Sequence, residues 1–114
     1  MLKHKNEIEK VTESNKNDIV KMYISCLAEF EEKNPKLRNF AFVSLNAGEE
    51  VEFHVHEGEC EYYYILSGDA IYNDNGVETE VYPGTITFTP SGTGHGIRNV
   101  GKDSLEFMAL ILRD

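Results

Sequence analysis

Four side chains of this sequence have the chemistry of transition-metal ligands: His54, His56, Glu61 and His95. Because side chains alternate between the two faces of a strand, histidines at positions i and i+2 point to the same side and can bind one ion. Three imidazoles and one carboxylate suit one divalent transition metal (Mn, Fe, Ni, Co or Zn) better than Mg²⁺ or Ca²⁺, which prefer oxygen ligands. Four protein ligands would leave two positions of a six-coordinate ion open for water or a small substrate.

Glycine, proline and asparagine residues recur at fixed intervals around these four positions. The block over residues 48–68 contains Gly48, His54, His56, Glu61 and Gly68, and the block over residues 84–99 contains Gly84, Pro90, Gly92, His95 and Asn99. Both blocks resemble the two signature motifs of the cupin family, with every expected position present. The resemblance implies an all-β fold, namely a double-stranded β-helix (jelly-roll) barrel of the small, single-domain, RmlC-like type. It also implies that the four residues named above bind the metal.

The ligand set has alternatives within the sequence. Buried histidines satisfied by hydrogen bonds, with Glu61 at an exposed strand start, would show the same residue types without any metal. Glu57 and Glu59 stand close enough along the chain to replace Glu61 as the carboxylate ligand, although the cupin spacing favours Glu61.

Candidates for catalysis beyond the metal ligands are Glu52 and Tyr63. Strand parity predicts Glu52 on the face of the histidine pair, where it could accept a proton or orient a ligand. Tyr63 is predicted to point inward, where it could donate a hydrogen bond to a bound oxyanion or pack in the core. Parity also predicts four apolar residues in the pocket wall: Phe42, Ile65, Ile97 and Met108.

Length and composition fit one ordinary globular domain of 114 residues, 40% of them hydrophobic. We expect a polar N-terminal arm over residues 1–17 and a single domain over residues 18–114. The net charge of −9 argues against nucleic acid and anionic membrane as partners. The polar N terminus lacks a secretory signal, so we expect a cytoplasmic protein. Cys26 and Cys60 are too few for a disulfide framework, and a bridge between them is a minor alternative.

Strand-like runs separated by turn residues follow one another from residue 39 onward. The expected strands cover residues 40–45, 50–56, 61–66, 70–72, 77–81, 85–89, 97–100 and 105–112. Residues 19–27 fit either a helical face or strand alternation, and we favour a strand; residues 28–38 should form a short helical turn and a loop. Asn75 and Gly76, between two of the runs, are the strongest hairpin signal. About nine short strands indicate a jelly roll or a small barrel.

Two classes of function remain. The cupin resemblance implies a small metal-dependent enzyme (isomerase, dioxygenase, decarboxylase or lyase) that acts on an oxygen-rich sugar or organic acid. The alternative is a non-catalytic protein that binds or senses a small molecule at the metal. We favour the enzyme because the ligand set is complete and open coordination positions are expected. Tyr62, Tyr64 and Leu66 form a second apolar face opposite Glu61, and a homodimer would cover it.

Overall fold

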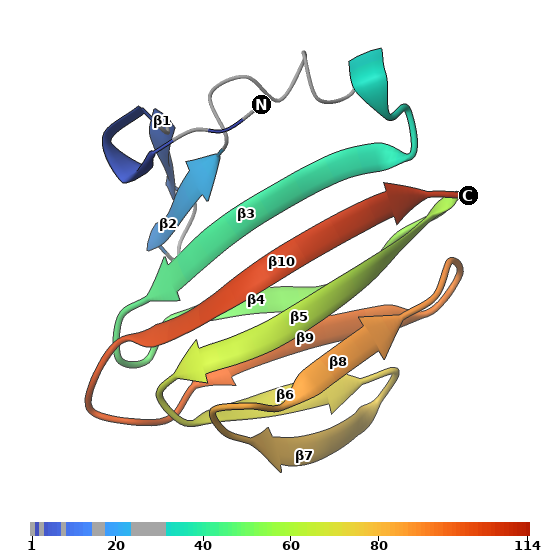
Figure 1. Ribbon diagram of the computed structural model, residues 1–114. Helices are drawn as coiled ribbons and strands as arrows, with labels where there is room; N and C mark the ends of the chain where they lie inside the picture. Colours follow the sequence, from blue (N-terminus) through green and yellow to red (C-terminus); the bar gives the residue numbers. More distant parts are fainter. Residues whose placement is uncertain (1, 3, 8, 15–17, 24–31) are drawn as a thin grey trace.

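The chain folds into two antiparallel sheets, as the computed structural model in Figure 1 shows. The structure describes residues 2, 4–7, 9–14, 18–23 and 32–114. Among them lie a 3-10 turn, η1 (Lys5–Glu7), and ten strands: β1 (Glu9–Ser14), β2 (Asp18–Tyr23), β3 (Leu37–Leu45), β4 (Glu50–Val55), β5 (Glu59–Ser67), β6 (Ala70–Asp74), β7 (Val77–Val81), β8 (Ile86–Thr89), β9 (Gly94–Asn99) and β10 (Leu105–Arg113). One sheet has the strand order β1-β2-β3-β10-β5-β8, and the other has the order β4-β9-β6-β7. The predicted all-β jelly-roll fold is confirmed.

The apolar core lies between the sheets and comes from strict alternation along the longest strands. On β10, Leu105, Phe107, Ala109 and Ile111 are buried, and the residues between them are partly exposed. Burying a large apolar side chain such as Leu105, Phe107 or Ile111 stabilises the fold by about 1.5–3 kcal/mol. The same alternation on β3 and β5 means that every second side chain of β3, β5 and β10 points toward the second sheet. These buried side chains pack beneath the candidate site.

The expected strands from residue 40 onward correspond to β3 through β10, with boundaries that differ by a few residues. The strand predicted over residues 19–27 is present as β2 up to Tyr23; residues 24–31, where the rest of it and most of the predicted helical turn fall, lie outside the described residues. No helix in the described part of the chain is long and apolar enough to cross a membrane.

The sequence prediction missed β1. Residues 1–17 were expected to be a loosely ordered arm, and this is wrong for Glu9–Ser14, which pair with β2 from Glu9 opposite Tyr23 to Ser14 opposite Asp18. The segment is polar, and backbone pairing at a sheet edge needs no apolar side chains. The hydrophobic pattern therefore gave no signal for it.

The hairpin predicted at Asn75 and Gly76 is confirmed. It joins β6 to β7, and both residues have positive φ, 49° for Asn75 and 101° for Gly76. Two successive residues with positive φ define the turn type whose twist matches that of paired strands, and Asn-Gly is its preferred sequence. The amide of Gly76 also donates a hydrogen bond to Asn73 Oδ1 at 2.7 Å.

Two β-bulges interrupt the pairing beside the site. On β4, Val51 pairs with Ile97 and His54 pairs with His95, so Glu52 and Phe53 together face Gly96 alone. On β3, Leu37 pairs with Leu112 and Asn39 pairs with Ile111, which leaves Arg38 as the extra residue. A bulge turns the side chains after it onto a face that plain alternation would not assign to them. Both bulges change which residues reach the space between the sheets.

Candidate metal centre

The four predicted ligands come from both sheets and meet between them. His54 is on β4 and His95 is on the neighbouring β9, where the two residues are direct cross-strand partners. His56 follows the end of β4, and Glu61 lies on β5 of the other sheet. The ligand atoms of the four residues all lie within 4.8 Å of one another. The structure thus brings together every residue that the sequence assigned to the metal.

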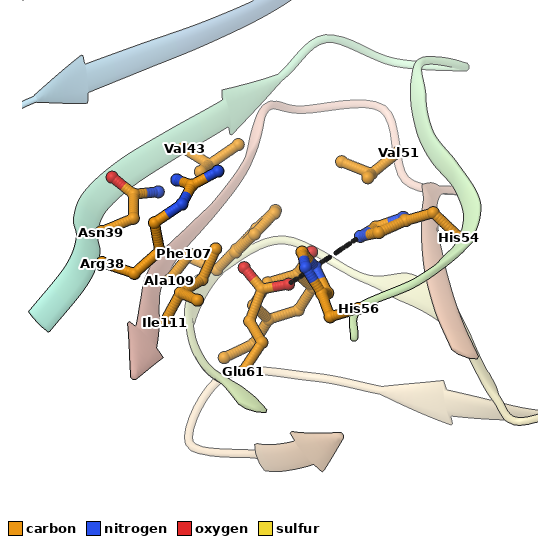
Figure 2. A pocket seen from close by; sticks show the side chains of 11 residues that line it. Arg38, Asn39, Val43, Val51, His54, His56, Glu61, Phe107, Ala109 and Ile111 are labelled. Carbon is orange, nitrogen blue, oxygen red and sulfur yellow. Dashed lines mark hydrogen bonds and ion pairs between the residues drawn. The ribbon is translucent and has the colours of Figure 1, made fainter. Parts of the chain in front are cut away.

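The converging atoms are the three imidazole Nε2 atoms and Glu61 Oε1. Nε2 of His54 lies 3.1 Å from Nε2 of His56 and 3.2 Å from Nε2 of His95. Glu61 Oε1 lies 3.0 Å from His56 Nε2 and 2.8 Å from His95 Nε2. The longest of these separations, 3.9 Å, joins Glu61 Oε1 to His54 Nε2. Figure 2 shows His54, His56 and Glu61 pointing toward one another at the wall of the pocket.

These separations fit the coordination shell of one ion. Two atoms bound ~2.1 Å from a six-coordinate ion lie ~3.0 Å apart when they are adjacent and ~4.2 Å apart when they are opposite. The four short separations match adjacent ligands, and the longer one, between His54 and Glu61, approaches the value for opposite ligands. The donor set of three nitrogens and one carboxylate oxygen suits a first-row transition metal.

The hydrogen bonds on the far side of each ring orient the histidines. His54 Nδ1–H donates to the backbone carbonyl oxygen of Glu52 at 2.7 Å, and His56 Nδ1–H donates to Glu59 Oε1 at 2.7 Å. Because a carbonyl and a carboxylate only accept, both rings must carry their proton on Nδ1 when neutral. The Nε2 lone pairs of these two rings then face each other at 3.1 Å. This arrangement is favourable only with positive charge between them, as a metal ion would supply.

His95 is held by two hydroxyl groups. Its ring has none of its surface exposed, and its Nδ1 lies 2.9 Å from Tyr72 Oη and 3.0 Å from Thr89 Oγ1. The two hydroxyls also contact each other at 2.9 Å. Sequence reasoning missed both residues because the contacts depend on tertiary structure: β6 is the neighbour of β9 in the same sheet, and β8 lies in the other sheet. Such outer partners fix the orientation of a metal-binding histidine.

Glu61 is 5% exposed, yet its surroundings favour the ionised form. Burial by itself would raise the pKa of this carboxyl, but when the imidazoles are protonated, hydrogen bonds from His54 and His95 and the charges of His95 and His56 outweigh burial and lower the pKa to about 2. A carboxylate that stays ionised among imidazoles is ready to bind a cation. Glu59 faces the opposite side of the His56 ring, so the geometry favours Glu61 over Glu59 as the ligand.

The two catalytic candidates have different positions. Tyr63 is 3% exposed, lines the pocket, and lies with its ring 4.9 Å from that of His95. Burial, and then the charge of Glu61, raise the pKa of Tyr63 well above its ordinary value, so its hydroxyl keeps its proton. Glu52 is exposed and is not among the residues that line the pocket, because the β4 bulge turns its side chain out of phase with His54. Its backbone carbonyl, which accepts from His54, is what reaches the site.

The pocket beside the ligands has a volume of about 200 Å³. Its wall includes Arg38, Asn39, Val43, Val51, His54, His56, Glu61, Tyr63, Phe107, Ala109 and Ile111. The parity prediction is wrong for Phe42 and Met108, which alternate with the buried residues of β3 and β10 and therefore lie on the outer face. Ile65 and Ile97 are buried in the core cluster and are not in the wall. Arg38 and Asn39 were not predicted: Asn39 is in phase with the buried residues of β3, opposite to the parity assumed for Phe42, and Arg38 is the extra residue of a bulge, which leaves no trace in the sequence pattern.

Comparisons with known proteins agree with this geometry. The cupin domain family matches residues 41–111. An oxalate-binding protein of Thermotoga maritima is 44% identical over 82 residues, which cover 72% of this chain and 68% of the relative. The crystal structure of a predicted oxalate decarboxylase from Thermotoga maritima superposes with a TM-score of 0.88 at 36% identity and covers 100% of both chains. An RmlC-like cupin from Shewanella frigidimarina gives a TM-score of 0.77 at 16% identity over 98% of this chain and 89% of the other, a likeness of fold alone.

Proposed function

Because this chain belongs to the cupin family, we propose that it holds one divalent transition metal on its three clustered histidines and Glu61 and binds a small organic acid there. The observation that carries the proposal is the convergence of the Nε2 atoms of His54, His56 and His95 on Glu61 Oε1. His54 and His56 have Nδ1 engaged by groups that only accept, so their Nε2 lone pairs are available to a cation. When bound, the ion would act as a Lewis acid that polarises a bound oxygen.

An organic acid is supported as the ligand by size, charge and kinship. A water molecule takes up ~30 Å³ in the liquid, so a cavity of about 200 Å³ suits a ligand of a few heavy atoms. A relative that covers most of this chain is named for binding oxalate, the smallest dicarboxylate. The pocket wall includes the cationic Arg38, which favours an acid over a neutral sugar.

Two modes of action fit this ligand, and each has a feature in its favour. Turnover is supported by Tyr63, whose protonated hydroxyl lies in the pocket wall and could donate a hydrogen bond to a bound oxyanion. Binding without turnover is supported by the lack of a second acid–base carboxylate: among the described lining residues, Glu61 is the only carboxylate. We favour a metal-dependent enzyme, with a binding or sensing protein as the alternative.

Metal content is the first test. Protein purified without a histidine tag should contain close to one transition-metal ion per chain by elemental analysis, and a His54→Ala/His56→Ala double variant should contain none. An Arg98→Gln variant, altered on an exposed residue of β9, is the control and should keep its metal. A wild-type protein that stays metal-free after reconstitution with Mn, Fe, Ni, Co and Zn would refute the proposal.

Turnover is the second test. Protein loaded with metal is incubated with oxalate, and formate and carbon dioxide are measured; hydrogen oxalate would give one of each. Product that forms with wild type and not with the double variant identifies an enzyme of the decarboxylase type. Tight binding of oxalate without product identifies the binding protein.

We also propose that the protein acts in the cytoplasm as a homodimer. The outer face of the six-stranded sheet carries large apolar side chains that are 38–66% exposed: Phe40, Tyr62, Tyr64, Leu66, Ile86 and Phe88. Tyr62 and Phe88 stack on this face with their ring centroids 4.8 Å apart. A contiguous apolar face of this kind is uncommon on a monomer, and a second copy would bury it symmetrically.

A further inference from the structure

The β3 bulge brings two adjacent polar side chains to the metal pocket. In a regular strand, Arg38 and Asn39 would point to opposite faces of the sheet. The bulge leaves Arg38 without a cross-strand partner between the pairs of Leu37 and Asn39, and both Arg38 and Asn39 line the pocket. Figure 2 shows the two side chains together on the wall that faces Glu61 and the histidines. Bulges next to functional sites often re-aim a side chain in this way.

Asn39 lies in this pocket wall, and its side-chain oxygen makes no hydrogen bond with the described residues. The residue is 6% exposed. Leaving a buried amide oxygen unpaired costs about 1–3 kcal/mol, so such a group is normally satisfied by water or by a ligand. An amide offers both a donor and an acceptor, and a half-turn exchanges them in nearly the same space. Asn39 can therefore meet a carboxylate oxygen or a hydroxyl in the pocket.

Arg38 supplies positive charge at the same wall. Its Nε lies 3.7 Å from Glu59 Oε2, and its side chain is 48% exposed. The long contact uses only part of the guanidinium, whose planar fork can bind two carboxylate oxygens at once. A divalent ion with Glu61 leaves one net positive charge on the ligand shell, and Arg38 adds a second. Glu59, beyond the lining, reduces this total without reversing its sign.

We propose that Arg38 and Asn39 form a carboxylate-recognition wall that selects doubly charged acids among the ligands of the metal. One end of the acid binds the ion, and its outer oxygens bind the guanidinium of Arg38 and the amide of Asn39. The inference rests on the proposed function, because it requires an ion on the four ligands. It goes further in assigning specificity to two residues that lie outside the region where the metal ligands are encoded.

The test compares a dianion with a monoanion of nearly the same size. Oxalate and glycolate each present two oxygens to a metal, and they differ in one negative charge. Their dissociation constants for Mn²⁺-loaded protein are measured by titration calorimetry, together with the affinity for Mn²⁺ alone. The variants are Arg38→Gln, Arg38→Lys and Asn39→Asp, with Arg98→Gln as the control. Arg98→Gln removes the same charge from an exposed residue that lines a different cavity.

In wild type, oxalate should bind at least tenfold more tightly than glycolate. Arg38→Gln should reduce that ratio about tenfold, Asn39→Asp should reduce it as well by adding negative charge, and Arg38→Lys should restore part of it. Arg98→Gln should leave the ratio unchanged, and all four variants should bind Mn²⁺ as wild type does. This pattern would establish the recognition wall.

Other results are as decisive. An unchanged ratio in Arg38→Gln, or wild-type protein that binds Mn²⁺ but does not prefer oxalate, would overturn the inference and leave the metal site standing. Loss of Mn²⁺ in Arg38→Gln would mean that Arg38 acts on His56 through Glu59, and the inference would again be wrong. Wild-type protein that binds no Mn²⁺ or other transition metal would remove the proposed function and the inference with it.

Discussion

Glu59 and Glu61 are two residues apart, and the structure gives them different positions at the candidate metal site. Glu61 Oε1 lies among the Nε2 atoms, 2.8 Å from that of His95. Glu59 Oε1 lies behind His56, 2.7 Å from Nδ1. The perturbation that separates these roles is a pair of substitutions, Glu59→Gln and Glu61→Gln, each of which removes one charge and keeps the shape. We expect both to weaken metal binding, with Glu61→Gln much the more damaging.

The expected loss of metal affinity on changing Glu59 follows from its single contact with the His56 ring. Changing a carboxylate acceptor to an amide acceptor keeps a hydrogen bond to His56 but removes its charge assistance, which accounts for about half of its strength. Loss of an outer partner of a metal-binding histidine typically weakens metal affinity about 10- to 100-fold. Glu59→Gln should therefore weaken metal affinity about tenfold, which corresponds to about 1.4 kcal/mol. Glu59→Ala, which leaves Nδ1 without its acceptor, should approach 100-fold.

The assay is competition for Mn²⁺ or Zn²⁺ against a chromophoric chelator at fixed pH and ionic strength. Circular dichroism and the melting temperature of each variant without metal confirm that the fold is kept. The dissociation constant for the metal should be lowest for wild type and should rise through Glu59→Gln and Glu59→Ala to Glu61→Gln. If Glu59→Gln lost as much affinity as Glu61→Gln, Glu59 would be a direct ligand and the assignment made from the Nδ1 contact would be wrong.

Two further predictions concern the outer face and the interior. Tyr64→Glu combined with Phe88→Glu places charge on the outer face of the sheet and should convert a dimer into a folded monomer, measured by light scattering; a wild-type monomer at micromolar concentration would contradict the homodimer. Burial raises the pKa of Tyr63 in the folded state, so its contribution to stability is complete below pH ~10 and is lost as the pH rises further. Tyr63→Phe should therefore raise the pH of alkaline unfolding, followed by circular dichroism. Tyr62→Phe, on a partly exposed tyrosine, is the control, and an equal shift in both variants would contradict this account.

The clustering of the four candidate ligands could be predicted from the sequence because their positions depend on local features. The His54–His56 pair needs only strand alternation, and the turn glycines that frame the motifs include Gly48 and Gly84, with φ of 81° and 93°. The residue types and the local backbone conformation, both inferred from neighbouring residues, are then enough to predict where these side chains lie. The same holds for the Asn75-Gly76 hairpin, whose two positive φ values follow from its sequence.

Residues that serve the site from a distance could not be predicted in this way. Tyr72 and Thr89 reach His95 from β6 and β8, and their contacts span 23 and 6 residues along the chain. Nothing near either residue in the sequence marks it, because the pairing of β6 with β9 brings Tyr72 to Nδ1 and the packing of one sheet over the other brings Thr89 there. The strand β1 was missed for a related reason, since edge pairing is a backbone property.

The bulges explain both the error at Glu52 and the omission of Arg38. Alternation predicts faces correctly until one extra residue enters a strand, and beyond that point every assignment on the strand changes side. On β4 the extra residue is accommodated because Gly96 lies opposite: a Cβ at Gly96 would lie 3.0 Å from the Phe53 nitrogen and 3.1 Å from its Cα. This glycine lets His54 face the candidate metal site while the Glu52 side chain turns away. On β3 the second bulge directs Arg38 toward the same space. The cupin motifs therefore place the residues of the candidate metal site, and irregular pairing beside them places the other polar residues of the pocket wall.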